Sequence, residues 1–418
     1  MVSRKKYSPR EKLSVVLEGL RGDYVEKGPK DFLISGIKKN VFVLGLVSLF
    51  TDISSEMIYP LVPIFLTSVL GAPVAIVGLI EGIAESTASI LKTFSGWLSD
   101  RFEKRKPFVL GGYSLSALGK LLLSVAFVWP TVLMARFVDR LGKGVRTSAR
   151  DALIADETDS GSRGKAFGLH RAMDSTGAVI GPLVALVLMA VLKEQYRLIF
   201  LLSFFPAVLG VALLFFFVKE KKRQTFGSKE APRLSFAGFD KNFKMLLLVV
   251  VVFGLGNSSD VFLILRAKNL GLSATLVVLT YVLYNVVYAA FSTPAGVLSD
   301  RMGRKRLMVG GFLVFSGVYF ALAFISKSSY IWPLFAVYGV YIAVTEGVSR
   351  ALVTDMAQPE KRGTALGIYH TAVGLVTFAA SLIAGLLWTY IGPAATFVYG
   401  GAMALLAAFI LLFFMPAG

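Results

Sequence analysis

Acidic residues interrupt the strongly apolar stretches of this sequence, and two pairs of them have the spacing of one helical turn. Asp52 and Glu56 are four positions apart, and so are Glu81 and Glu85, so each pair would lie on one face of a helix. Carboxylates crowded together in a medium of low dielectric constant can bind and release a proton near neutral pH. The pairs favour a proton-coupled process, with the alternative that they balance cations on neighbouring helices.

The segment 131–155 is the most charged part of the apolar sequence. Its charged residues are Arg136, Asp139, Arg140, Lys143, Arg146, Arg150 and Asp151. Steps of three, four and seven place most of its cations roughly on one side of a helix. A charge at the centre of a bilayer costs about 2.5–3.5 kcal/mol, so this helix should line a cavity or pair with acids such as Asp52, Glu56 and Asp174. The three charges nearest its end can also be explained as a cluster at a membrane surface.

Polar residues of the second half of the chain are fewer and more aromatic. They are Asn257, Asp260, Tyr281, Tyr284, Asn285, Tyr288, Glu346 and Arg350. Such residues suit contact with the organic part of a small-molecule substrate. Tyrosines at a membrane interface and hydrogen bonds between helices would explain them equally well.

The elements that must position these residues are membrane-spanning helices. Of the 418 residues, 55% are hydrophobic and 17% are charged, which is too apolar for a soluble protein of this length. About 20 apolar residues span a bilayer, so we predict an all-α membrane protein with twelve spans. They are 41–66, 73–98, 108–128, 131–155, 165–192, 196–218, 243–265, 274–298, 307–326, 330–354, 364–390 and 394–416.

Several function classes are excluded or disfavoured by the same composition. The net charge of +18 lies in short loops between apolar runs, so we expect no nucleic-acid partner. The chain has no cysteine, which excludes disulfides and cysteine nucleophiles. No phosphate-binding loop or HExxH motif occurs, so we expect neither an enzyme nor an ATP-driven pump.

An internal repeat divides the chain. The segments 96–106 and 296–306 both read Gly-x-Leu-Ser-Asp-Arg followed by a basic cluster, and 152–156 and 163–168 are echoed by 351–355 and 362–367. We predict a tail at 1–36, a six-span half at 37–218, a linker at 219–242 and a second six-span half at 243–418. In the tail, Leu13, Val16, Leu17 and Leu20 have the spacing of a short amphipathic helix on a membrane face, with a loosely ordered segment as the alternative. Six spans in each half make a parallel pseudo-repeat.

These motifs resemble those of the major facilitator superfamily of transporters, from one end of the chain to the other. The repeated segments resemble its loop between spans 2 and 3, and Arg136-Phe137-Val138-Asp139 resembles its fourth-span signature. The stretch from Gly177 to Gly181 and Pro182 resembles the fifth-span signature of its antiporters.

The resemblance implies a twelve-span secondary transporter that works by alternating access, with no cofactor and with a proton gradient as the energy source. Its most direct reading is proton-coupled antiport that exports a small organic molecule, with Asp52, Glu56, Arg136 and Asp139 as the coupling set. By resemblance, Arg136 communicates with a first-span acid. One alternative is proton-coupled symport of an organic or inorganic anion, which the cations of 131–155 would attract. A weaker alternative is a metal-ion exporter that uses the two acid pairs, and a sensor that transports nothing is a further one.

The repeated loops would form a gate at the cytoplasmic face. The gating residues are Gly96, Asp100, Arg101, Lys104, Gly296, Asp300, Arg301 and Arg304, with Asp156 and Asp355 as acidic partners at the ends of spans 4 and 10. By resemblance, Asp100 would cap span 11 and Asp300 span 5. Lysine and arginine concentrate in the loops after spans 2, 4, 6, 8 and 10, which places those loops and both termini in the cytoplasm. We expect a monomer in the cytoplasmic (inner) membrane, with the lipid bilayer, protons and a small molecule as its partners.

Overall fold

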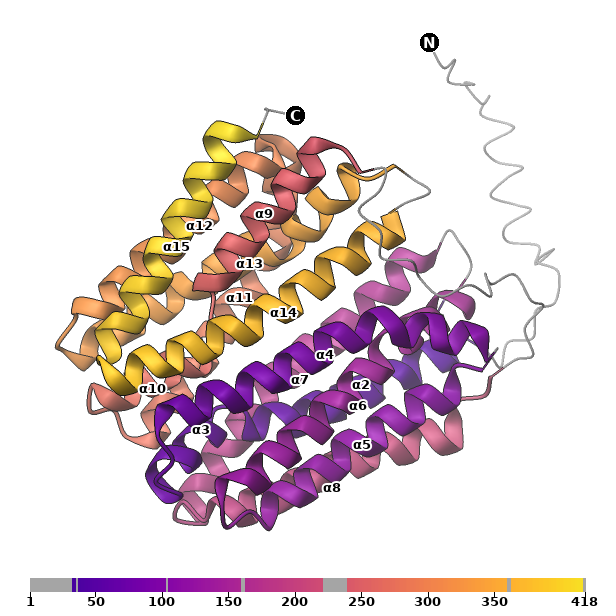
Figure 1. Ribbon diagram of the computed structural model, residues 1–418. Coiled ribbons are helices and arrows are strands. Elements are labelled where there is room, and N and C mark those ends of the chain that lie inside the picture. Colours follow the sequence, from indigo (N-terminus) through magenta and orange to yellow (C-terminus); the bar gives the residue numbers. More distant parts are fainter. Residues whose placement is uncertain are drawn as a thin grey trace, which may run out of the picture.

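The computed structural model describes residues 32–34, 37–102, 104–158, 162–220, 239–358 and 362–415, without the side chains of residues 32–34, 37, 96, 97, 100 and 300. Nearly all of the described residues are helical, and they form two bundles that lie side by side (Figure 1). Most of the predicted tail and linker, including the short amphipathic helix expected before residue 21, lies outside the described residues.

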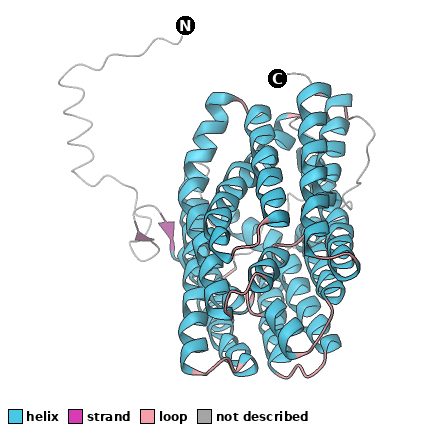
Figure 2. Ribbon diagram, turned by 90° about the vertical axis from the view of Figure 1, so that its left-hand side faces the viewer, coloured by secondary structure: helices cyan, strands magenta, loops and turns pink. Residues whose placement is uncertain are grey.

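The first bundle contains the helices before the linker. They are α2 (Lys39–Ile58), α3 (Val62–Ile64) with the π-helical turn η1 (Phe65–Val69), α4 (Val74–Arg101), α5 (Lys106–Ser124), α6 (Trp129–Asp156), α7 (Arg163–Val191) and α8 (Tyr196–Phe217). A two-stranded antiparallel ribbon, β1 (Phe32–Ile34) and β2 (Ile37–Lys38), precedes them beside the bundle (Figure 2). This ribbon is the one departure from the predicted all-α fold within the described residues.

The second bundle repeats the first. Its elements are α9 (Lys241–Gly256), α10 (Val261–Asn269), α11 (Ala274–Met302), α12 (Arg304–Phe324), the 3₁₀ turn η3 (Ser328–Tyr330), α13 (Ile331–Asp355), α14 (Arg362–Tyr390) and α15 (Pro393–Phe414). With α2, α3 and η1 counted as one span and α9 with α10 as another, the described chain has the twelve spans predicted, within a few residues. The fold class is confirmed.

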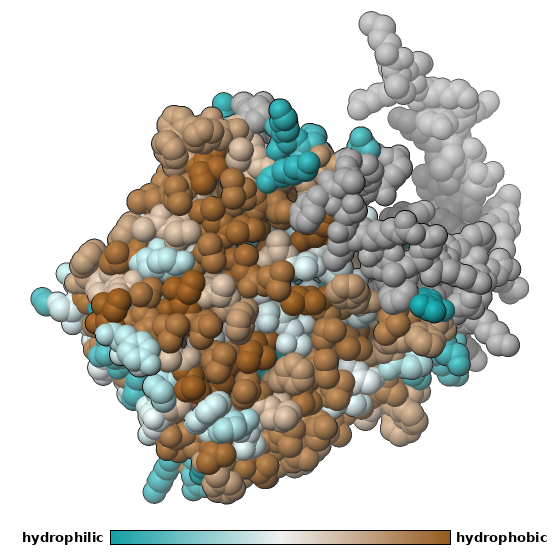
Figure 3. Space-filling model, in the orientation of Figure 1, coloured by the Kyte–Doolittle hydropathy of each residue, from teal (hydrophilic) through white to brown (hydrophobic). Residues whose placement is uncertain are grey.

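Ten of these spans are long and apolar enough to cross a membrane. The side of the molecule in Figure 3 is largely apolar, and its hydrophilic residues gather toward the two ends of the helices. The other two spans are α5, which carries Lys120, and α6, which carries charged residues from Arg136 to Asp156. Such helices can sit in a bilayer only if their charges are paired inside the protein.

Buried apolar residues reveal how the two bundles meet. At one end of the molecule, residues of both halves form a single core that includes Leu61, Phe65, Phe262 and Val277. At the other end each half has its own core. One core includes Tyr113 and consists of residues of the first half, and the other consists of residues of the second half. We call this second end the basic end, because the loops α4–α5, α6–α7, α11–α12 and α13–α14 lie there, and the first the opposite end. The halves are therefore joined at the opposite end and separated at the basic end.

Candidate transport site

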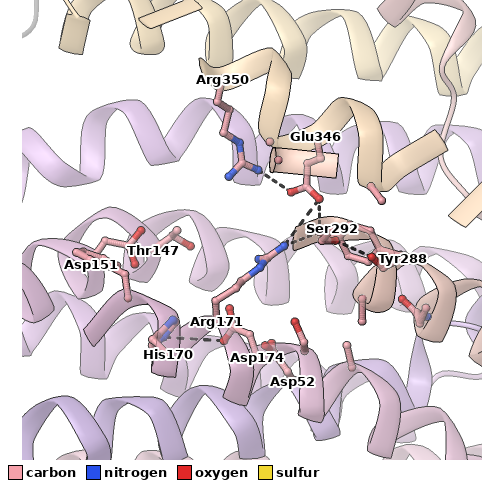
Figure 4. Close-up of a pocket in the computed structure, with 18 of the residues that line it drawn as sticks. Asp52, Thr147, Asp151, His170, Arg171, Asp174, Tyr288, Ser292, Glu346 and Arg350 are labelled. Carbon is pink, nitrogen blue, oxygen red and sulfur yellow. Dashed lines mark hydrogen bonds and ion pairs between the residues drawn. The ribbon is translucent and has the colours of Figure 1, made fainter. Parts of the chain in front are cut away.

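A cavity of about 950 Å³ lies between the two halves. Its walls come from α2, α4, α6 and α7 on one side and from α11, α12 and α13 on the other (Figure 4). It reaches from Asp52 and Glu56 in the middle of the bundle to helix ends at the basic end, where Phe167, Arg304 and Ala351 line it. Since the halves have separate cores at this end, the cavity is accessible from there.

Many of the residues singled out from the sequence line this cavity. They are Asp52, Glu56, Asp174, Tyr281, Tyr284, Asn285, Glu346, Gly296 and Arg304. Lys143 of the charged segment 131–155 also lines it, and so do Lys92 and Arg171, which were not predicted as site residues. A single cation in an otherwise apolar span is the signal that could have found Lys92 and Arg171.

The predicted common face of Asp52 and Glu56 is seen where α2 packs against α7. A Cβ atom at Gly177 would lie 2.9 Å from the Cβ atom of Asp52, and one at Gly181 would lie 2.8 Å from that of Glu56. Real Cβ atoms essentially never approach so closely. The two glycines therefore let α7 lie directly against the acidic face of α2, and Pro182 follows inside the same helix.

Asp174 joins this acidic group from α7. Its side chain lies beside that of Asp52 (Figure 4) and accepts a hydrogen bond from the Ser48 hydroxyl. Arg150 donates to the same hydroxyl at 3.2 Å, and His170 lies 3.9 Å from Asp174. Two carboxylates side by side repel each other when both are ionised, so this pair is a candidate to hold one proton at the edge of the cavity.

Aromatic residues close the cavity toward the opposite end. Tyr281 of α11 donates a hydrogen bond of 2.8 Å to Glu56 of α2, which links the two halves. The rings of Tyr59 and Tyr281 have centroids 5.5 Å apart, and the hydroxyl of Tyr59 lies 3.5 Å from that of Ser259. Tyr59 follows the end of α2, and Ser259 lies between α9 and α10, so the interrupted first spans of both halves meet at this layer.

Asp260, a predicted site residue of the second half, lies just behind this layer. Asp260 accepts hydrogen bonds from Tyr284 at 3.1 Å and from Tyr338 at 2.7 Å. Neither Asp260 nor Asn257 is among the residues that line the cavity. Asn257 follows the last residue of α9. Both residues therefore shape the break between α9 and α10, which holds Ser259 against the first half.

Ion pairs inside the first half account for most of the charges of α6, although not for Lys143. Arg136 donates to Glu81 at 2.9 and 2.7 Å, with side chains only 3% and 1% exposed. Arg140 lies 3.1 Å from Glu85. A second-span acid therefore engages the Arg136 guanidinium group in this structure, and the communication of Arg136 with a first-span acid during proton coupling stays a prediction.

Asp139 is paired in the same way. The ammonium group of Lys120, which is fully buried in α5, lies 2.9 Å from the Asp139 carboxylate. Neither Asp139 nor Arg136 lines the cavity. Lys120 was missed from the sequence, although a lone lysine in the middle of an apolar span is a signal for a buried acidic partner.

These pairs also bear on metal binding. Glu81 and Glu85 of the hypothetical metal set are engaged by arginines. Among the residues that the structure describes, no group of three or more histidine, aspartate or glutamate side chains could hold a metal ion.

The predicted gate residues lie at the basic end. Arg304 pairs with Asp355, and Arg105 lies 3.0 Å from Asp156, so basic residues beside these loops do lie against acids at the ends of spans 4 and 10. Each of these ion pairs joins elements of one half only. The cavity between the halves reaches the basic end. The side chains of Asp100 and Asp300 lie outside the described residues, and Arg101, Lys104 and Arg301 are exposed.

One polar bridge crosses the cavity. Glu346 of α13 accepts hydrogen bonds from Tyr288 of α11 and, at 2.7 Å, from Arg350. Arg171 of α7 reaches across the cavity from the other half, 2.5 Å from the Tyr288 hydroxyl and 3.8 Å from Glu346 (Figure 4). A ligand that enters from the basic end would meet this bridge before it reaches Asp52.

Known proteins resemble the chain over most of its length. A family model described as the Major Facilitator Superfamily matches residues 44–266 and again residues 246–418. An uncharacterized MFS-type transporter of Methanocaldococcus jannaschii is 39% identical over 386 residues, which cover 90% of this chain and 95% of that protein. The multidrug resistance protein MdtH of Aeromonas hydrophila subsp. hydrophila is 26% identical over 350 residues, which cover 83% of this chain and 87% of that one.

The fold is also found among solved structures. The crystal structure of a D-xylose-proton symporter has a TM-score of 0.72 at 18% identity, and the match covers 90% of this chain and 97% of that one. The family model matches both halves, and one relative is alike over nearly its whole length. The chain therefore belongs to the Major Facilitator Superfamily of transporters.

Proposed function

We propose that this membrane transporter works by proton-coupled antiport and exports a small organic molecule. The main support for the proposal is the close packing of Gly177 and Gly181 against Asp52 and Glu56. These acids lie at the inner end of a cavity that is accessible from one end of the bundle. This arrangement puts acids that can bind a proton where a substrate would bind. The cavity lies within one chain, which is consistent with a monomer.

The direction of transport follows from the charge of the loops. Lysine and arginine concentrate at the basic end, which by the positive-inside rule faces the cytoplasm. Both termini would then be cytoplasmic, in the inner membrane of the cell. The cavity would take its substrate from the cytoplasm and release it on the other side after the halves rock. The MdtH relatives, which are named multidrug resistance proteins, support export.

The acids of α2 and α7 would perform the coupling. A proton on the Asp52–Asp174 pair neutralises one of two adjacent carboxylates, and like charges so close repel each other when both are ionised. In this proposal a proton held by the pair and a substrate seated beside it occupy the site in alternation, which is what antiport requires. The hydrogen bond between Glu56 and Tyr281 would couple the protonation state of this acidic group to the position of the second half.

The other members of the predicted coupling set take a supporting role in this proposal. Arg136 and Asp139 lie in buried pairs with Glu81 and Lys120, away from the cavity. They hold α6 against α4 and α5 and so keep its remaining cations pointed at the cavity. We therefore place coupling at Asp52, Glu56 and Asp174.

Transport into inside-out membrane vesicles tests the proposal. A thermal-shift screen of the purified full-length protein over metabolites, drugs and metal ions first identifies ligands, since a ligand that binds the folded state stabilises it. A ligand should then accumulate in vesicles with an acidic lumen, and collapse of the pH gradient with nigericin should abolish accumulation. Asp52→Asn should accumulate none. Accumulation that is independent of the gradient would refute antiport.

A further inference from the structure

The cavity has more basic than acidic side chains. Its basic residues are Lys92, Lys143, Arg146, Arg150, Arg171, Arg304 and Arg350, and its acidic residues are Asp52, Glu56, Asp151, Asp174 and Glu346. A membrane-embedded cavity that carries an excess of one charge will concentrate ligands of the other.

Most of these cations have a partner. Arg150 pairs with Asp151 at 2.9 Å, Arg350 with Glu346 at 2.7 Å, and Arg304 with Asp355. Arg171 belongs to the bridge described above, and buried Arg146 contacts a serine hydroxyl and a tyrosine ring.

Lys92 and Lys143 differ from all of them. Within the described part of the chain, no carboxylate lies within 4.0 Å of either ammonium group, and neither group donates a hydrogen bond. Both side chains are half-buried in membrane-spanning helices. An ionised side chain in such a place is costly unless it has a partner, and it marks a functional site.

The two lysines come from one rigid junction between α4 and α6. Gly144 lets the helices approach, because a Cβ atom there would lie 2.6 Å from the Cβ atom of Leu91. Two hydroxyl groups join the backbones at the same level: Ser95 donates to the Gly144 carbonyl at 3.0 Å, and Ser148 donates to the Lys92 carbonyl at 2.6 Å. Lys92 and Lys143 are the direct sequence neighbours of this contact, and both line the cavity.

We propose that Lys92 and Lys143 bind an oxyanionic group, a carboxylate or a phosphate, of the transported organic molecule. This rests on the proposed function and names the class of its substrate. The substrate would supply the negative charge that the lysines lack, and Lys is well suited to a phosphate or carboxylate as a point charge. The wall formed by α11, with Tyr281, Tyr284 and Tyr288, would receive the apolar part of the same molecule.

Binding of four phenyl compounds to the purified full-length protein, measured by calorimetry, tests this inference. The probes are phenyl phosphate, phenylacetate, its uncharged analogue phenylacetamide, and the cation phenethylamine. We expect the two anions to bind at least tenfold more tightly than the amide and the amine, and the comparison of phenyl phosphate with phenylacetate identifies the preferred oxyanion. Similar affinity for anions and amide, or no binding of either anion, would overturn the inference.

Variants locate the effect. Lys92→Gln and Lys143→Gln should each weaken anion binding about tenfold, the loss of one charged hydrogen bond. Lys143→Arg keeps the charge, and Lys244→Gln removes an exposed lysine outside the cavity, so both should bind within threefold of the wild type. The melting temperature of the unliganded Lys143→Gln protein should equal or exceed that of the wild type, because the change removes an uncompensated charge. A lower value would indicate a merely structural lysine.

The outcome separates this inference from the antiport proposal. Gradient-driven accumulation of a neutral or cationic compound, with no binding of the anions, would overturn the anion site and leave antiport standing. Lysine-dependent binding of the anions, with flux that does not depend on the pH gradient, would support the anion site and overturn antiport.

Discussion

The pair of Arg136 and Glu81 shows how a highly charged helix is held in an apolar bundle, and its loss should be severe. The guanidinium group donates two hydrogen bonds to the carboxylate, and both side chains are almost completely buried. Arg136→Met would leave the Glu81 carboxylate buried without its partner. Removal of one partner from such a pair costs about 3–5 kcal/mol, whereas replacement of both by apolar residues is often neutral.

The apparent melting temperature of the detergent-purified protein measures this difference. Each six-helix half has the size at which 1 kcal/mol shifts a melting temperature by about 2–4 °C, so Arg136→Met should melt roughly 6–20 °C below the wild type. The double variant Glu81→Met/Arg136→Met should recover most of this loss. Because we assign the pair to support and not to coupling, the double variant should also retain gradient-driven transport.

Two results would refute this reasoning. If Arg136→Met melts like the wild type, the pair does not hold α6 in place. If the double variant melts normally but no longer couples transport to the pH gradient, the pair takes part in proton coupling, and the assignment of coupling to the α2–α7 interface is wrong.

Three other changes give distinct expectations. Gly181→Val should force α7 away from α2, lower stability by about 1–3 kcal/mol and abolish transport, whereas Gly168→Val in the same helix, where an added Cβ meets nothing within 4 Å, should do neither; equal effects would contradict the close-approach argument. Tyr281→Phe removes a hydrogen bond between the halves worth about 0.5–1.5 kcal/mol, so a cysteine at Ala72, at the opposite end of this otherwise cysteine-lacking chain, should react several-fold faster with a maleimide; an unchanged rate would argue against the tyrosine as a closing contact. Arg304→Gln breaks an exposed ion pair and should lower the free energy of unfolding by no more than about 1 kcal/mol, with a correspondingly small drop in melting temperature; a larger drop would show that this pair is structural.

The sequence alone predicts much of the fold, because length and apolarity define the spans and the repeat defines the two halves. The shared face of Asp52 and Glu56 is also predictable, since helical spacing determines which residues point the same way. Their position beside Gly177 and Gly181 was not predicted, because spacing within one helix does not determine which helix packs against it. The distances between Cβ atoms in the structure show this close packing directly.

The pairing of charges is not predictable in the same way. Spacing along α6 shows which cations share a side, but the partner of each depends on how neighbouring helices are rotated and how close they lie. Arg136 was expected to communicate with α2, and in this structure it pairs with Glu81 of α4. Lys120 was not predicted as a site residue, yet its ammonium group pairs with the Asp139 carboxylate. A sequence pattern within one helix cannot distinguish a cation that is paired from one that awaits a ligand.

Proton movement in proteoliposomes tests the central claim, that the acids of α2 and α7 exchange a proton for substrate. The purified protein is reconstituted into liposomes with an acidic lumen and an enclosed pH-sensitive dye, and a compound identified by thermal shift is added outside. Antiport predicts that the lumen becomes more alkaline as the compound enters, in the wild type and not in Asp52→Asn or Asp174→Asn. Entry of the compound without proton movement, or with acidification of the lumen, would contradict the account.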